Sequence, residues 1–166
     1  GVKDGTRRDV QRALIELGYA SPGIPRPSRT RFVGLLVPEL DNPIFPAFAQ
    51  HIETLLAKHD IVSVLCTATS TGLPESRYID LLLERGVSGF IVVSGMNADT
   101  AVDHELYRRL IGDGMPVVFV NGRVDDVDAP YVSADDGHAV ELAVGHLASL
   151  GHERIGCVVG PRRYIP

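Results

Sequence analysis

The sequence predicts an α/β fold with a doubly wound parallel sheet, and three observations support this prediction. From residue 31 onward, short apolar runs alternate with stretches whose apolar residues recur at helical spacing. The apolar runs are nearly continuous, as in strands that are covered on both faces. Most runs are bounded by Gly, Pro, Asn or Asp, which end strands and helices. Repeated strand–helix units of this kind imply right-handed crossovers between parallel strands.

Each element can be justified in chain order. The first expected helix spans 6–19, because Val10, Ala13, Leu14 and Leu17 share one face. Three prolines then make 21–28 a stiff linker. Apolar runs predict strands at 32–37, 61–65, 89–93, 116–120, 131–133 and 154–159. Helical periodicity predicts helices at 43–59, 73–84, 100–113 and 136–150.

The composition is that of a soluble globular domain, with 45% hydrophobic and 22% charged residues among 166. No apolar run approaches the roughly 20 residues that a membrane-spanning helix needs. The first residues lack the apolar core of a secretory signal, so we expect a cytoplasmic protein without a membrane partner. Cys66 and Cys157 both lie in apolar runs and are expected to be buried, with no disulfide framework and no metal-ligand spacing.

Charge is distributed unevenly along the chain. Residues 1–31 contain seven basic and three acidic side chains, whereas the remainder contains nine basic and eighteen acidic ones. A basic arm on an acidic body is typical of an appendage that faces a polyanion, although a solvated helix followed by a basic linker gives the same pattern.

The polar loops that follow the strands are the place to expect a ligand. In parallel α/β sheets, ligands bind beyond the carboxyl ends of the strands. The corresponding loops are 38–45, 67–73, 94–99, 121–128 and 160–166, which are rich in Asn, Asp, Ser, Thr, Gly and Pro. Such neutral-to-acidic loops suit a hydroxylated ligand better than a polyphosphate.

Motifs of enzymes and cofactor sites are missing from the sequence. It contains no phosphate-binding P-loop, no dinucleotide-binding glycine motif, no His-Glu-x-x-His pair and no nucleophile elbow. His138 and His146 are two helical turns apart, too far to share a metal ion. We therefore predict no catalytic residues, no metal and no cofactor. Asp136 is expected to cap the helix that follows it, which leaves Asp135 free to face a cleft.

Four stretches in order resemble one family. TRRDVQRALIELGY (6–19) is similar to the last helix of the DNA-binding headpiece in lactose-repressor/galactose-repressor regulators. RTRFVGLLVPELDNPIF (29–45) resembles the entry to the effector-binding core of that family. PVVFVNGR (116–123) and the stretch at 132–161 follow in the same order, so the resemblance covers essentially the whole chain.

The resemblance implies a helix-turn-helix headpiece, a hinge, and two α/β lobes of the type I periplasmic-binding-protein fold with a cleft between them. It implies a homodimeric transcription regulator, usually a repressor, that grips or releases operator DNA when a small effector such as a sugar or nucleoside binds. By position, the effector-binding residues would be Asn42, Phe45, Asn121, Arg123 and Asp135. The DNA-facing arm would carry Arg7, Arg8, Arg26 and Arg29.

The same resemblance divides the chain into three parts. Residues 1–20 would end the headpiece, 21–30 would form the hinge, and 31–166 would form the first core lobe. The two headpiece helices that enter the major groove would precede residue 1, and the second lobe would follow residue 166. The family's hinge helix inserts a leucine into the minor groove, whereas stretch 24–29 has two prolines and no leucine. The helices after 41–43 and near Leu73 are expected to form the lobe's share of the dimer interface.

Two other functional classes stay open on the sequence. A soluble sugar-binding receptor domain with the same fold would explain the polar loops, but it leaves the helix at 6–19 and the basic arm without a role. A small α/β enzyme of flavodoxin or phosphatase type would need Asp135 as an acid–base group.

Overall fold

The structure of the protein is a computed structural model that describes residues 31–69, 71–125 and 127–165. The chain divides into two units, residues 1–30 and residues 31–166. The expected helix at 6–19, the linker at 21–28 and the four arginines of the basic arm lie outside the described residues.

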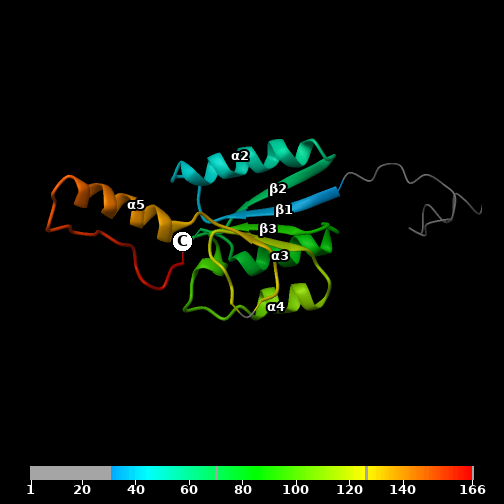
Figure 1. Ribbon diagram of the computed structural model, residues 1–166. Coiled ribbons are helices and arrows are strands. Elements are labelled where there is room, and N and C mark those ends of the chain that lie inside the picture. Colours follow the sequence, from blue (N-terminus) through cyan, green and yellow to red (C-terminus); the bar gives the residue numbers. More distant parts are fainter. Residues whose placement is uncertain (1–30, 70, 126, 166) are drawn as a thin grey trace, which may run out of the picture. The chain divides into compact units, whose positions relative to one another are not determined.

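The second unit is built on a five-stranded parallel sheet, shown in Figure 1. The strand order is β2-β1-β3-β4-β5, so that the chain starts in the interior of the sheet and extends it first to one side and then to the other. This order confirms the predicted parallel, doubly wound sheet. The strands are β1 (Arg31–Val37), β2 (Ile61–Thr67), β3 (Phe90–Val93), β4 (Val117–Val120) and β5 (Tyr131–Val132).

Helices cover both faces of this sheet (Figure 1). One face carries α2 (Ile44–Ala57), and the other carries α3 (Glu75–Glu84) and α4 (Glu105–Gly112). A short 3-10 helix, η1 (Met96–Ala98), follows β3, and α5 (Asp136–Ser149) follows β5. No helix in the described part of the chain is long and apolar enough to span a bilayer.

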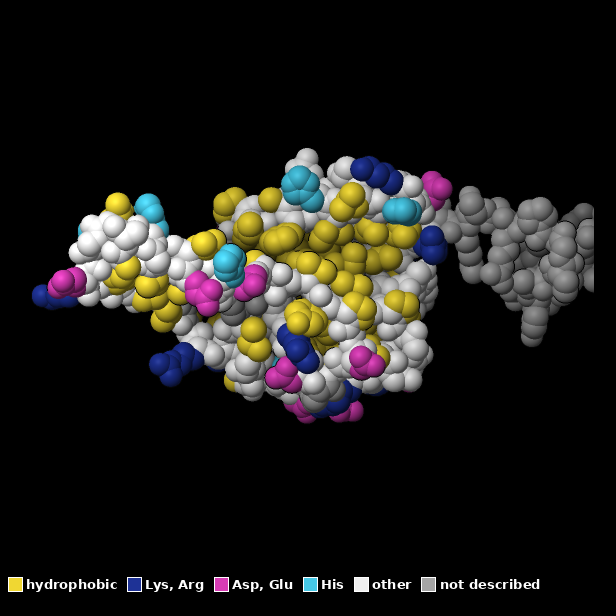
Figure 2. Space-filling view, in the orientation of Figure 1, with side chains coloured by type: hydrophobic (Ala, Val, Ile, Leu, Met, Phe, Trp, Pro, Cys, Tyr) yellow, Lys and Arg dark blue, Asp and Glu magenta, His cyan; other side chains and the backbone are white. Residues whose placement is uncertain are grey.

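The side chains of the strands pack into two hydrophobic clusters of unequal size, one on each face of the sheet. In β1, Leu36 faces the larger cluster, in which Ile79, Tyr107 and Phe119 are also buried, while its neighbour Leu35 faces the smaller cluster. This alternation is the period-two pattern of a strand with two buried faces. The smaller cluster lies under α2, and Figure 2 shows further hydrophobic side chains at the surface in a band alongside this helix.

The predicted strand at 154–159 is wrong. These residues have no regular secondary structure and are exposed, including Cys157, which was also expected to be buried. An apolar run forms a strand only where a neighbouring strand can complete its hydrogen bonds. The edge strand β5 ends at Val132, and α5, which has no buried residue, leads the chain away from it (Figure 1).

Two predicted helix starts also need correction. Helix α4, predicted at 100–113, begins at Glu105, because the backbone N–H and the hydroxyl of Thr100 donate instead to the carbonyl oxygen of Arg163, at 2.8 and 2.9 Å. The cap of α5 is Asp135 and not Asp136, since Oδ1 of Asp135 accepts from the backbone N–H of His138 at 2.9 Å. The other helices match their predicted positions within about two residues.

Gly34 in β1 provides a test of core packing. A Cβ atom at this position would lie 2.6 Å from Cδ1 of Phe90 and 2.9 Å from Cδ1 of Leu82. We expect Gly34→Ala to lower the free energy of unfolding by about 1–3 kcal/mol, because overpacking forces buried side chains to move. Urea unfolding of the full-length protein measures this change.

The matched control is Gly112→Ala in the last turn of α4, where an added Cβ would meet no atom within 4 Å. There the free energy of unfolding should stay the same or rise by up to about 1 kcal/mol, because alanine favours helix. Equal effects of the two substitutions would contradict the packing described for β1.

Candidate functional site

A pocket of about 320 Å³ lies at the carboxyl edge of the sheet. Its walls come from segments far apart in the chain, and they include parts of four of the five loops that were predicted to face a ligand. The lining residues are Pro38, Ala68, Pro74, Glu75, Ser94, Gly95, Met96, Asp99 and Tyr164.

Two polar residues meet at this edge where neighbouring strands end. Ser94 follows β3 and Asn121 follows β4, and Nδ2 of Asn121 donates to Oγ of Ser94 at 3.2 Å. Both residues have positive φ, 47° for Ser94 and 56° for Asn121, a conformation that is uncommon outside glycine. Backbone strain of this kind concentrates at functional sites, so the pair is a candidate contact for a ligand.

Glu75 supplies a buried carboxyl group in the pocket wall. It is only 3% exposed, although it is the first residue of α3. Its Oε2 accepts from the backbone N–H of Met96 at 3.0 Å, and its Oε1 accepts from the hydroxyl of Tyr107 in α4. Burial raises the pKa of Glu75, and these two hydrogen bonds, together with the nearby His104, oppose that rise.

Tyr107 and His104 complete this cluster. Tyr107 is fully buried, and burial together with the Glu75 carboxylate raises its pKa far above the ordinary value, so that the phenol stays protonated. His104 donates from Nε2 to the carbonyl oxygen of Met96 at 3.0 Å. Both hydrogen-bonding groups of the Met96 backbone are therefore held by side chains.

The segment before residue 166 returns to the same edge. The guanidinium Nη2 of Arg163 lies 2.9 Å from Oδ2 of Asp99, and the backbone N–H of Ile165 donates to the carbonyl oxygen of Ala98 at 2.8 Å. These contacts place the ring of Tyr164 in the pocket wall. The hydrogen bond from the Arg163 guanidinium to the Tyr164 hydroxyl raises the pKa of Arg163, and the negative charge of Asp99 raises it further.

The chemistry of the pocket is that of hydrogen bonding to a neutral ligand. A hydroxyl at Ser94, a carboxylate at Asp99 and an aromatic ring at Tyr164 border the same space. None of the described lining residues is basic, so the walls offer no cation to a phosphate group.

A family model described as periplasmic binding proteins and sugar binding domain of LacI family matches residues 30–163. The chain belongs to the LacI/GalR family. This assignment confirms the resemblance that the sequence motifs suggested, and with it the type I periplasmic-binding-protein fold.

Two known transcriptional regulators are similar along the whole chain. The HTH-type transcriptional regulator reg1 of Streptomyces lividans is 48% identical, and the match covers 100% of this chain and 48% of that protein. The regulator MalR of Streptomyces coelicolor is 47% identical, with the same coverage. The chain therefore spans about half the length of these relatives.

A solved structure from the same family is also similar. The LacI family transcriptional regulator of Enterococcus faecium, crystallised with bound ribose, is 31% identical with a TM-score of 0.58. The match covers 74% of this chain and 42% of that one.

The five residues predicted to bind the effector occupy different environments. Asn121 does not itself line the pocket, but its Nδ2 donates to Oγ of Ser94, which does. Asn42 is exposed, and its Oδ1 accepts from the backbone N–H of Ile44 at the start of α2, while the ring of Phe45 packs against the smaller cluster. Arg123 is exposed beside Asp125 at 3.4 Å, and Asp135 caps α5. Their contact with an effector stays a prediction.

None of the residues that line the pocket was named as a site residue from the sequence, and three of them show why. Ser94 and Tyr164 lie inside predicted ligand-facing loops, so position after a strand was a signal for them. Glu75 gave no such signal, because an acidic residue in the first turn of a helix is ordinarily a surface residue that favours the helix dipole.

The raised pKa of Glu75 predicts how stability depends on pH. The folded protein binds this proton more tightly than the unfolded chain does, so Glu75 stabilises the fold most below the ordinary pKa of 4.5. This contribution is lost as the pH rises through the raised pKa. Relative to wild type, Glu75→Gln should therefore gain stability between pH 4.5 and neutral pH in chemical unfolding.

The control for this experiment is Glu84→Gln, which removes an exposed carboxylate from the other end of the same helix. Its stability profile should run parallel to that of the wild type. A Glu75→Gln profile that is also parallel would contradict the burial of Glu75.

Proposed function

We propose that the full-length protein is a sequence-specific DNA-binding transcription regulator, a repressor, whose core binds a small sugar-like effector between two α/β lobes. In this proposal residues 1–20 end the headpiece, residues 21–30 form the hinge, and residues 31–166 belong to the effector-binding core. Membership of the LacI/GalR family supports it, as do the relatives reg1 and MalR, which are named HTH-type transcriptional regulators.

The observation that carries the effector proposal is the strained pair Ser94–Asn121 beside a pocket without basic lining residues. A hydroxyl and an amide held at fixed positions suit the hydroxyl groups of a neutral sugar. The aromatic ring of Tyr164 adds an apolar surface on which a sugar ring can pack. The ribose bound to the similar Enterococcus regulator is consistent with this ligand class.

The DNA proposal rests on the sequence of the basic arm. Arg7, Arg8, Arg26 and Arg29 would contact backbone phosphates and so contribute affinity without reading bases. The effector would act by shifting the population between arrangements of the two lobes that differ in affinity for DNA.

A gel-shift experiment on the full-length protein tests this proposal. The DNA is selected from a random-sequence pool, and neutral sugars and nucleosides are added one at a time. We expect sequence-specific binding that at least one compound changes. If no condition gives sequence-specific binding, the proposal is contradicted, and the sugar-binding receptor domain without a DNA role becomes the better reading.

The substitution Asn121→Gly separates effector binding from DNA binding. Glycine adopts the positive φ of residue 121 without strain but removes the amide that faces Ser94. Losing one hydrogen bond in this half-buried site costs about 1–3 kcal/mol, so the concentration of effector needed for half response should rise about five- to 150-fold. DNA affinity without effector should stay unchanged, and an unaltered effector response would contradict the role of Asn121.

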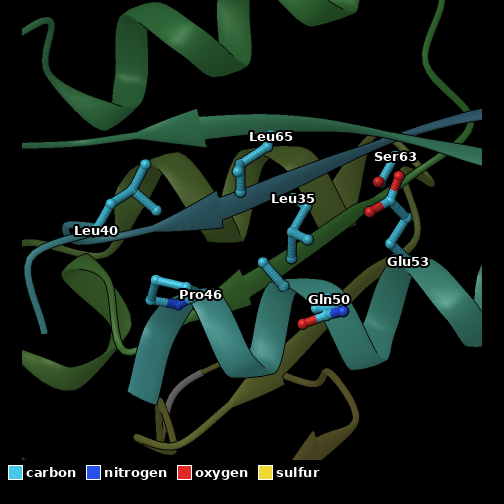
Figure 3. Close-up of a pocket in the computed structure, with 8 residues that line it drawn as sticks. Leu35, Leu40, Pro46, Gln50, Glu53, Ser63 and Leu65 are labelled. Atoms are coloured by element: carbon cyan, nitrogen blue, oxygen red, sulfur yellow. The ribbon is translucent and has the colours of Figure 1, made fainter. Parts of the chain in front are cut away.

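We also propose a homodimer through the β2 side of the sheet. A groove of about 430 Å³ lies between α2 and β2. Figure 3 shows Leu35, Leu40, Pro46 and Leu65 among the side chains that line it. Leu40 and Leu65 are 49% and 45% exposed, and β2 is an edge strand, which ordinarily needs cover. The helix α3 packs against β1 from the opposite face. The two helices expected from the sequence to form the dimer interface, α2 and α3, therefore lie on either face of the sheet near its β2 edge.

Leu40→Glu tests this interface without touching a core element, because Leu40 lies in the loop between β1 and α2. A charge in the groove should weaken self-association at least tenfold in sedimentation velocity of the full-length protein. Leu40→Met keeps the apolar surface and is the control. Equal dissociation constants for both variants would place the dimer contact elsewhere.

A further inference from the structure

We propose that Asn97, in the middle of η1, is a positioning residue that fixes the loop after β4 against the loop after β3. The consequence for function rests on the proposed effector site, because these two loops carry Asn121 and Ser94. Asn97 itself lies outside the set of residues that line the pocket.

The side-chain amide of Asn97 is buried and uses its donors and its acceptor. It is 1% exposed. Its Nδ2 donates to the carbonyl oxygens of Asn121 and Gly122, at 2.6 and 2.9 Å, and its Oδ1 accepts from the backbone N–H of Gly95 at 2.9 Å. One side chain therefore joins two backbone segments that are more than twenty residues apart in the chain.

The loop after β3 and the loop after β4 lie in close contact at Gly122. Gly122 has a φ of 71°, and a Cβ atom there would lie 2.7 Å from Cα of Ala98 in η1. Asn121, directly before it, has the positive φ that turns its side chain toward Ser94. The carbonyl group that Asn97 holds most closely belongs to this same strained residue.

The other side of η1 is fixed to the helices. Glu75 accepts from the backbone N–H of Met96, and His104 donates to the Met96 carbonyl oxygen, so the turn is held from α3 and from the start of α4. Because these contacts hold η1 in place, the Asn97 hydrogen bonds restrain the backbone of Asn121 relative to the helices.

An amide is the side chain that this geometry requires. Aspartate has the same shape as asparagine, but an ionised carboxylate only accepts hydrogen bonds and would face two carbonyl oxygens. It would still accept from Gly95. Asn97→Asp should therefore release the loop after β4 while it keeps the link within the loop after β3.

Amide hydrogen exchange of the full-length protein, without ligand, tests the positioning directly. In Asn97→Asp we expect exchange at the amides of 121–123 to become at least tenfold faster, while Gly95 and the β3 amides keep their wild-type rates. Asn97→Ala removes all three hydrogen bonds and should speed exchange at Gly95 as well. Arg85→Gln changes the net charge by the same amount as Asn97→Asp, at an exposed site beyond the far end of α3, and should change neither.

The same variants are then titrated with D-ribose and with other neutral mono- and disaccharides. Asn97→Asp should bind whichever sugar the wild type binds at least tenfold more weakly, with Arg85→Gln unchanged. Unchanged exchange at 121–123, or faster exchange at every amide alike, would overturn the proposal. Faster exchange confined to 121–123 in a protein whose wild type binds no sugar would support the positioning role and contradict the effector function.

Discussion

The carboxyl edge of the sheet depends on one buried group, the carboxyl of Glu75. A carboxyl group that is 3% exposed and has no basic partner among its hydrogen bonds must be satisfied by neutral donors. The donors are the hydroxyl of Tyr107 and the backbone N–H of Met96, which belong to two other elements. Satisfying this group therefore fixes α3, α4 and η1 relative to one another.

From this fixed turn the geometry extends to the residues that face the pocket. Asn97 holds the carbonyl oxygen of Asn121, and the side chain of Asn121 donates to Ser94 in the pocket wall. The positions of Asn121 and Ser94 therefore follow from the buried cluster. Both keep an unfavourable backbone conformation, and the surrounding hydrogen bonds maintain it. A site built in this way presents its polar groups already in place, which lowers the entropy cost of binding a small ligand.

The sequence predicted the sheet well because its evidence is local: apolar runs and helical periodicity follow from which faces are buried. It failed at 154–159, where the residues are as apolar as a strand but no neighbouring strand accepts their hydrogen bonds. It predicted a ligand at the carboxyl edge from parallel topology, and a pocket lies at this edge. It did not find Glu75 or Asn97, because their burial depends on contacts with residues more than twenty positions away.

A crystal structure of the full-length protein with a bound sugar tests the account most directly. We expect sugar hydroxyl groups within hydrogen-bonding distance of the side chains of Ser94 and Asn121, with both Asn97 hydrogen bonds to the loop after β4 retained. A sugar bound away from the carboxyl edge of the sheet, for example in the groove between α2 and β2, would contradict it.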